Sequence, residues 1–110
     1  MEVLFRNEKE REFYQSEKLL RKEYGELARA ITKRLIHLKS FESVGAFLEK
    51  GLGKPHLLTG DYDKCIAVNI SPNYRLILEP MYDTDTDFSK LNLYAVKVVT
   101  ILEVKDYHGN

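Results

Sequence analysis

The sequence lacks the cysteines for an internal disulfide, an excess of charge of either sign and any long apolar run. The single cysteine, Cys65, has no partner within the chain, which favours the reducing cytoplasm over a secreted location. Seventeen basic residues balance 17 acidic ones, and this balance argues against strong non-specific binding of nucleic acid. No apolar stretch approaches the roughly 20 residues that a membrane-spanning helix needs, and residues 1–6 lack the pattern of a signal peptide. We therefore expect a cytoplasmic protein without membrane association.

Length and composition predict one folded domain. The 110 residues are 44% hydrophobic and 31% charged, which is typical of a soluble globular protein large enough to bury a core. The sequence has no internal repeats, low-complexity tracts or linker-like segments. We therefore predict a single domain over residues 1–110.

The beginning of the chain predicts a short strand and a helix. Residues 2–5 are mostly apolar and predict an edge strand. The spacing of Asn7 and Glu10 matches a capping box, in which the first residue caps a new helix. This helix is expected to run to about Tyr24 and to end at Gly25, since glycine is the preferred residue after a helix.

A second helix is predicted over residues 26–39. Its apolar residues recur at helical spacing and should form a buried face: Leu27, Ile31, Leu35 and Leu38. A short helical turn is predicted over residues 43–50, and the first two helices should form a hairpin.

The second half of the chain predicts an antiparallel sheet. Short apolar segments separated by turn residues are expected to form strands over residues 55–58, 65–70, 74–79 and from residue 98 onward. Ile66, Val68 and Ile70 alternate, so they should share one face. The predicted fold is α+β, with a helical hairpin and a helical turn packed on one face of three to four antiparallel strands. The opposite face is left open for function.

Neither of the two possible metal-binding patterns in the sequence is complete. Asp83, Asp85 and Asp87 resemble the start of a calcium loop, but Phe88 and Tyr94 stand where that loop needs glycine and an acid. The three histidines and one cysteine are too scattered for a zinc motif. We therefore predict a solvated acidic loop, and neither a metal site nor a cofactor.

Two further features favour structural roles. Cys65 lies between apolar residues in a predicted strand and should be a small core residue. Arg29, Lys33 and His37 recur every four residues and form a basic line along the second helix. Such a line could contact a nucleic-acid backbone, but it is more typical of a solvated helix face.

Proton-handling side chains lie at the ends of the predicted strands. The last strand ends in residues 106–108, an acid, a phenol and an imidazole; the alternative interpretation is a polar chain end. Arg75 lies in the middle of a strand, where arginine is expected only on an open face or beside a partner, and His56 begins a strand. Metal-independent RNA cleavage needs such groups: a base for the ribose 2′-OH, a cation for the phosphorane and an acid for the leaving 5′-oxygen.

The chain resembles the RelE/ParE superfamily of bacterial toxins, and within it the HigB-like plasmid-maintenance killer proteins. The resemblance covers nearly the whole chain. It is carried by the His-x-Leu-x-Gly-Asp of residues 56–61, the Asn-Tyr-Arg-Leu-Ile of residues 73–77 and the ending Ile-Leu-Glu-Val-Lys-Asp-Tyr-His of residues 101–108.

This resemblance implies a toxin that cleaves mRNA in the ribosomal A site without a metal and leaves a 2′,3′-cyclic phosphate. It also implies an antitoxin with a helix-turn-helix domain, through which operator DNA would be contacted only indirectly. The implied catalytic residues are His56, Arg75, Asp106, Tyr107 and His108. The residues predicted to contact the substrate are Lys54, Lys64 and Asn73.

Two alternatives remain open at this point. Relatives often carry basic residues around the second strand, where this chain has Leu57, Thr59, Tyr62 and Asp63. Because these basic residues are missing, a non-catalytic module that only binds an antitoxin is the first alternative. A sister branch, the ParE-like proteins, poisons DNA gyrase without nuclease chemistry. That branch lacks the histidines, so His56 and His108 count against it.

Overall fold

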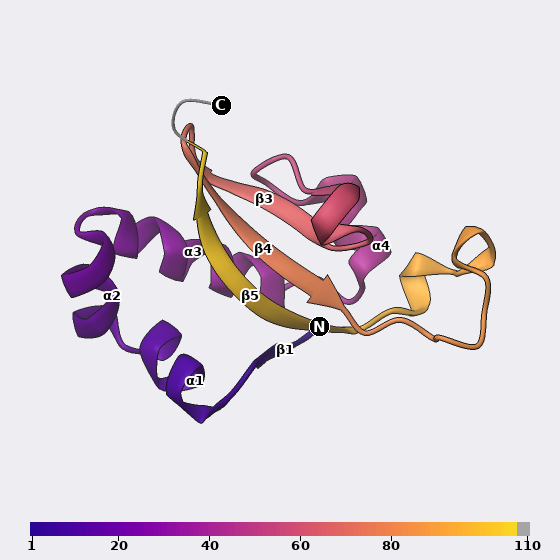
Figure 1. The fold of residues 1–110 in the computed structure, drawn as a ribbon, viewed down its shortest axis with the longest axis horizontal. Helices are drawn as coiled ribbons and strands as arrows, with labels where there is room; N and C mark the ends of the chain where they lie inside the picture. Colours follow the sequence, from indigo (N-terminus) through magenta and orange to yellow (C-terminus); the bar gives the residue numbers. More distant parts are fainter. Residues whose placement is uncertain (108–110) are drawn as a thin grey trace.

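Within residues 1–107, which the computed structural model describes, five strands form one sheet in the order β1-β5-β4-β3-β2 (Figure 1). The strands are β1 (Glu2–Phe5), β2 (His56–Leu57), β3 (Ile66–Ser71), β4 (Tyr74–Pro80) and β5 (Val98–Asp106). The four strands β2 to β5 are antiparallel, as the sequence predicts. The strand β1 lies at the predicted edge but pairs in parallel with β5. Parallel neighbours require a crossover, and the helices between β1 and β2 belong to it.

The helices differ from the prediction at one point, because the first predicted helix is two helices. The observed helices are α1 (Glu8–Gln15), α2 (Glu17–Tyr24), α3 (Leu27–Lys39) and α4 (Val44–Lys50). Ser16 has an extended backbone, with φ −104° and ψ 110°, and its hydroxyl accepts the Leu19 N–H at 3.1 Å. A side-chain cap of this kind begins a new helix, so Ser16 ends α1 and starts α2.

The other helix signals are confirmed. The Asn7 side chain accepts the Glu10 N–H at 2.8 Å and caps α1. Gly25 follows α2 with φ +60°, a conformation that glycine adopts without strain. Ser43 caps α4 through the Ala46 N–H. Within residues 1–107, every helix falls short of the length and apolar character needed to span a bilayer.

The sheet carries a large core on one face and a small one on the other. The large core lies under the helices and includes Ile31, Leu35, Leu38, Ile66, Val68, Leu76, Leu78, Val99 and Ile101. The small core consists of Cys65, Ala67 and Ile77, against which Leu58, Tyr62 and Leu102 pack. Cys65 is 5% exposed, which confirms its predicted core role. We call the sheet face with the small core the open face.

A β-bulge in β5 decides which residues of this strand reach the open face. Ile77 lies opposite Glu103, whereas its neighbour Leu78 lies opposite Ile101, so β5 contains one extra residue here. A one-residue shift exchanges the two faces of all residues beyond it. The bulge therefore keeps Val104 on the helix side and directs Lys105 to the open face.

The loop between β4 and β5 contains two turns of 3-10 helix, Phe88–Lys90 and Leu93–Ala95. The Asp83 carboxylate accepts hydrogen bonds from the Asp85 N–H at 2.9 Å and from the Thr86 hydroxyl at 2.8 Å. These bonds, that of Thr86 first, hold the pKa of Asp83 below its usual value. The acidic side chains of this loop are exposed, as predicted for a solvated loop.

Candidate active site

Arg75 and Tyr107 lie against each other on the open face. The Arg75 guanidinium carbon is 4.3 Å from the centre of the Tyr107 ring, within the range of a cation–π contact. The Tyr107 N–H donates to the Asn73 carbonyl at 2.7 Å, so the turn before β4 anchors the backbone from which the ring projects. Arg75 shares its face with Ile77 of the small core, because residues two apart in a strand point the same way.

His56 lies on the same face, two strands away. It is opposite Ala67 in β3, which is opposite Ile77 in β4. Two strand spacings and two residue steps separate His56 from Arg75, roughly 12 Å between their Cα atoms. The His56 side chain is exposed and is therefore accessible to a ligand on this face.

The imidazole of His56 is held by the backbone just before it. Its Nδ1 lies 2.9 Å from the Lys54 carbonyl oxygen. A carbonyl oxygen can only accept, so Nδ1 carries the hydrogen in the neutral ring and Nε2 is left as the acceptor. The chain reaches this position through Gly53 and Lys54, both with positive φ. Lys54 and Asn73 are predicted substrate contacts. In the structure the Lys54 carbonyl bonds to His56, and the Asn73 carbonyl bonds to Tyr107.

Two other predicted residues lie apart from the Arg75–Tyr107 pair. Asp106 is opposite Tyr74, whose side chain packs on the helix side of the sheet, so alternation turns Asp106 away from the open face. Lys64 lies before β3, at the opposite end of that strand from Asn69, the partner of Arg75. Its ammonium nitrogen is 5.2 Å from the centre of the Phe88 ring. The predicted catalytic residue His108 lies outside the described residues.

The open face also holds two residues that the sequence did not single out as functional. The Lys105 ammonium nitrogen is 4.8 Å from the centre of the Tyr62 ring, and Lys105 is paired with Arg75 across β4 and β5. The signal in the sequence was a lysine two residues before Tyr107. It could not be assigned to a face without knowledge of the bulge.

Other nucleophiles and ligands in the described part of the chain do not join this site. Burial raises the pKa of the Cys65 thiol, so the thiolate needed for nucleophilic attack is disfavoured. Among residues 1–107, no three histidine, cysteine, aspartate or glutamate side chains are grouped so that they could hold a metal ion. The residues on the open face therefore offer an imidazole, a guanidinium, an ammonium and two phenols.

The residues of the predicted basic line on α3 differ in their exposure. Arg29 and Lys33 are exposed, whereas His37 is half-buried. The His37 Nε2 accepts the Leu52 N–H at 3.0 Å, and its ring lies edge-on to Phe41 and Phe47. His37 therefore holds the segment after α4 in place, as expected for a structural residue.

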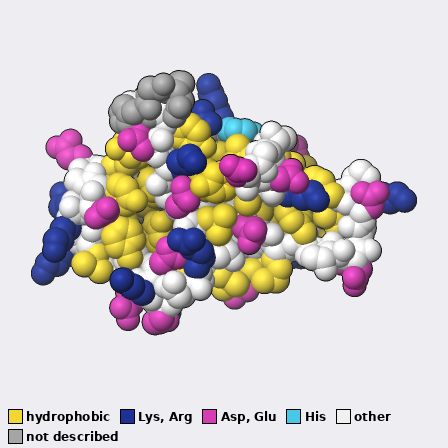
Figure 2. All heavy atoms as spheres, viewed as in Figure 1, with side chains coloured by type: hydrophobic (Ala, Val, Ile, Leu, Met, Phe, Trp, Pro, Cys, Tyr) yellow, Lys and Arg dark blue, Asp and Glu magenta, His cyan; other side chains and the backbone are white. Residues whose placement is uncertain are grey.

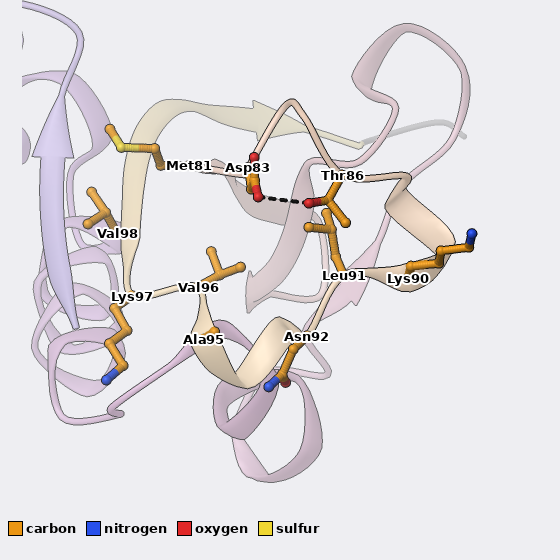
Figure 3. A pocket seen from close by; sticks show the side chains of 10 residues that line it. All are labelled: Met81, Asp83, Thr86, Lys90, Leu91, Asn92, Ala95, Val96, Lys97 and Val98. Carbon is orange, nitrogen blue, oxygen red and sulfur yellow. Dashed lines mark hydrogen bonds between the residues drawn. The ribbon is translucent and has the colours of Figure 1, made fainter.

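A hollow of about 510 Å³ lies beside the start of β5, at the end of the sheet away from the Arg75–Tyr107 pair (Figure 3). Its lining includes Asp83, Thr86, Lys90 and Lys97 together with apolar side chains, and the Asp83 carboxylate is already bonded to Thr86. None of the predicted site residues lines it.

Figure 2 shows basic and acidic side chains interspersed with hydrophobic ones over the face in view, without a large patch of one sign.

The fold is that of the YoeB/ParE toxins over nearly the whole chain. The chain is similar to a YoeB/ParE toxin from Agrobacterium tumefaciens, with a TM-score of 0.57 and 12% identity over 98% of this chain and 100% of that one. It is also similar to a chain of the YoeB-YefM complex from Staphylococcus aureus, with a TM-score of 0.56 and 18% identity over 98% and 97%. No family model and no curated protein matches the sequence. At these identities the likeness defines the fold, and activity has to be argued from the site.

Proposed function

We propose that this chain is a toxin of the RelE/ParE superfamily, of the HigB-like kind, which cleaves mRNA in the ribosomal A site. The observation that carries the proposal is the Arg75–Tyr107 cation–π contact on the same open sheet face as His56. The YoeB/ParE fold supports it.

The proposed reaction is transfer within the RNA backbone. A base removes the 2′-OH proton, the 2′-oxygen bonds to phosphorus, and the bond from phosphorus to the 5′-oxygen breaks as an acid protonates that oxygen. The products are a 2′,3′-cyclic phosphate and a free 5′-OH. Histidine suits both proton transfers because its ordinary pKa is close to neutral. His56 supplies an imidazole with a free Nε2, and Tyr107 and His108 complete the proposed catalytic set. Asp106 stays a predicted member of this set, although it faces the helix side of the sheet.

Arg75 has the task of stabilising the pentavalent phosphorane. The Arg75 guanidinium lies over the Tyr107 ring, a contact that does not neutralise the cation, so its N–H groups stay available for phosphate oxygens. This arrangement fixes the arginine before the substrate arrives, which makes electrostatic stabilisation effective. The proposed position of the reacting phosphodiester is between the side chains of His56 and Arg75, whose Cα atoms are roughly 12 Å apart. Lys54, Lys64 and Asn73 remain predicted contacts to the RNA.

The proposed partner is an antitoxin with a helix-turn-helix domain that holds the toxin inactive in the cytoplasm. The similar Staphylococcus aureus chain comes from a YoeB-YefM complex, which supports a partner protein for this chain as well. Operator DNA would be contacted only through that antitoxin.

The test is inducible expression in bacteria followed by mapping of mRNA ends. We expect growth arrest and cleavage inside the codons of translated messages. Cleavage by His56→Ala should be abolished, and Arg75→Ala should lower the rate by about 10²–10³-fold, as loss of an oxyanion donor does. Arg75→Lys keeps the charge but loses the planar fork, so it should remain impaired.

Lys33→Ala is the matched control, because it removes an exposed charge from α3, on the other side of the sheet. It should cleave like the wild type. Arrest with intact mRNA and accumulated gyrase–DNA breaks would refute the nuclease proposal in favour of the ParE-like alternative. A harmless wild-type protein would favour the antitoxin-binding module.

A further inference from the structure

Two cations lie side by side on the open face. Arg75 of β4 and Lys105 of β5 are directly opposite each other in the antiparallel register, with Cβ atoms about 4.5–5.5 Å apart. Like charges in directly opposed positions destabilise a sheet. A protein that keeps such a pair in its sheet sacrifices some stability there, which is typical of a functional site.

Neither cation is neutralised by a carboxylate in the described part of the chain. The ion pairs found between described residues are Arg6–Glu10, Glu8–Arg11 and Glu17–Arg21, all within or beside α1 and α2. Arg75 and Lys105 each lie over a tyrosine ring instead, at 4.3 Å and 4.8 Å. A cation–π contact attracts a cation without cancelling its charge, so both charges remain available to an anion.

Tyr62 is a fixed platform next to Lys105. It follows β2 in a turn of 3-10 helix, Gly60–Tyr62, and packs against the small core of Cys65, Ala67 and Ile77. The ring is half-buried, so part of it stays accessible on the open face. These contacts place four side chains in a row on the open face, with the two cations between the two aromatic rings: Tyr107, Arg75, Lys105 and Tyr62.

We propose that Lys105 and Tyr62 form a second nucleotide subsite beside the Arg75–Tyr107 pair. Lys105 binds the phosphate next to the one that is cleaved, and Tyr62 stacks on a nucleobase. The inference rests on the proposed function, because it assigns the neighbouring nucleotide of the same single-stranded RNA.

The chemistry of the four side chains favours this ligand. Cations and aromatic rings next to one another on an open surface are the usual platform for single-stranded nucleic acid. Arginine presents a planar fork suited to the reacting phosphate, whereas lysine is a point charge on a flexible stem. Lysine therefore suits a phosphate that is held but does not react.

The experiment measures binding separately from cleavage. A fluorescent 2′-O-methyl RNA oligonucleotide has no 2′-OH proton and cannot be cleaved by the proposed reaction. Its affinity is measured by anisotropy over a series of salt concentrations. For single strands the logarithmic salt slope changes by about 0.7 per neutralised phosphate. Lys105→Met should therefore weaken binding and lower the magnitude of the slope by about 0.7.

Replacement of Tyr62 should change the affinity but not the salt slope. Tyr62→Leu should weaken binding roughly 5- to 150-fold, as expected for loss of one stacked base, with the salt slope unchanged. Tyr62→Phe keeps the ring and should bind like the wild type. Lys97→Met removes the same charge from an exposed position just before β5, and its slope should equal that of the wild type.

The outcomes separate this inference from the proposed function. If the wild type cleaves mRNA on ribosomes but does not bind the oligonucleotide, or if Lys105→Met and Tyr62→Leu bind it unchanged, the subsite is refuted and the nuclease stands. If the wild type binds with the expected dependence on both residues but does not cleave, the subsite stands and the nuclease is refuted. If it neither binds nor cleaves, both are wrong.

Discussion

Replacing Gly53 by alanine should destabilise the protein by more than backbone strain alone. Gly53 has φ +84°, and a Cβ atom there would lie 2.7 Å from the Asn69 carbonyl oxygen and 2.7 Å from Cγ2 of Val68. The Gly53 carbonyl accepts the Asn69 N–H at 2.7 Å, and Arg34 donates to the Asn69 carbonyl at 2.8 Å. The two backbones therefore cannot separate without loss of hydrogen bonds.

Two terms set the size of the effect. A side chain at a left-handed backbone position costs about 1–2 kcal/mol, and overfilling a packed contact costs about 1–3 kcal/mol. Their sum is about 2–5 kcal/mol in the free energy of unfolding. For a chain of this size, at roughly 4 °C per kcal/mol, the melting temperature should fall by roughly 8–20 °C.

Gly60→Ala is the matched control. Gly60 also has a positive φ, +74°, but a Cβ atom there would have no neighbour within 4 Å. This variant should show only the strain, about 1–2 kcal/mol. Urea unfolding followed by circular dichroism measures both variants, with the m-value as a check on the unfolded state. Equal destabilisation by the two variants would refute the close approach of Gly53 to Asn69.

Three further predictions concern single side chains. Ser16→Ala should lower the free energy of unfolding by about 1 kcal/mol because α2 loses its cap, and Ser16→Asp should stay near the wild type; urea unfolding of both checks this. Burial raises the pKa of Tyr82 to about 12 from 10, and its hydroxyl donates to the Lys64 carbonyl. The stability that this phenol contributes is therefore fully present below pH 10 and is lost as the pH rises towards 12. Unfolding series across that range should show a shallower alkaline loss for Tyr82→Phe than for the wild type; parallel curves would contradict this. Cys65 should react with a disulfide reagent far more slowly in the folded protein than in urea, since burial raises its pKa.

Local patterns in the sequence were enough to predict most elements. The alternation of Ile66, Val68 and Ile70 predicted β3 and its buried face, which the structure confirms. Caps such as Asn7 and Gly25 act within one helical turn, so their signals are also local. Ser16 shows the limit: its predicted helix is interrupted by a single side-chain cap that the charged sequence around it did not reveal.

Only the tertiary structure decided which side chains meet. The parallel pairing of β1 with β5 joins segments about as far apart as the chain allows, and no local pattern specifies such a pair. The extra residue in β5 turns Lys105 and Tyr107 to the open face, beside Arg75 and Tyr62, and it leaves Asp106 on the other side. The residues predicted for catalysis were chosen from the sequence by their chemistry. Their arrangement depends on strand register, which is set by contacts between distant segments and is therefore invisible in any short stretch of sequence.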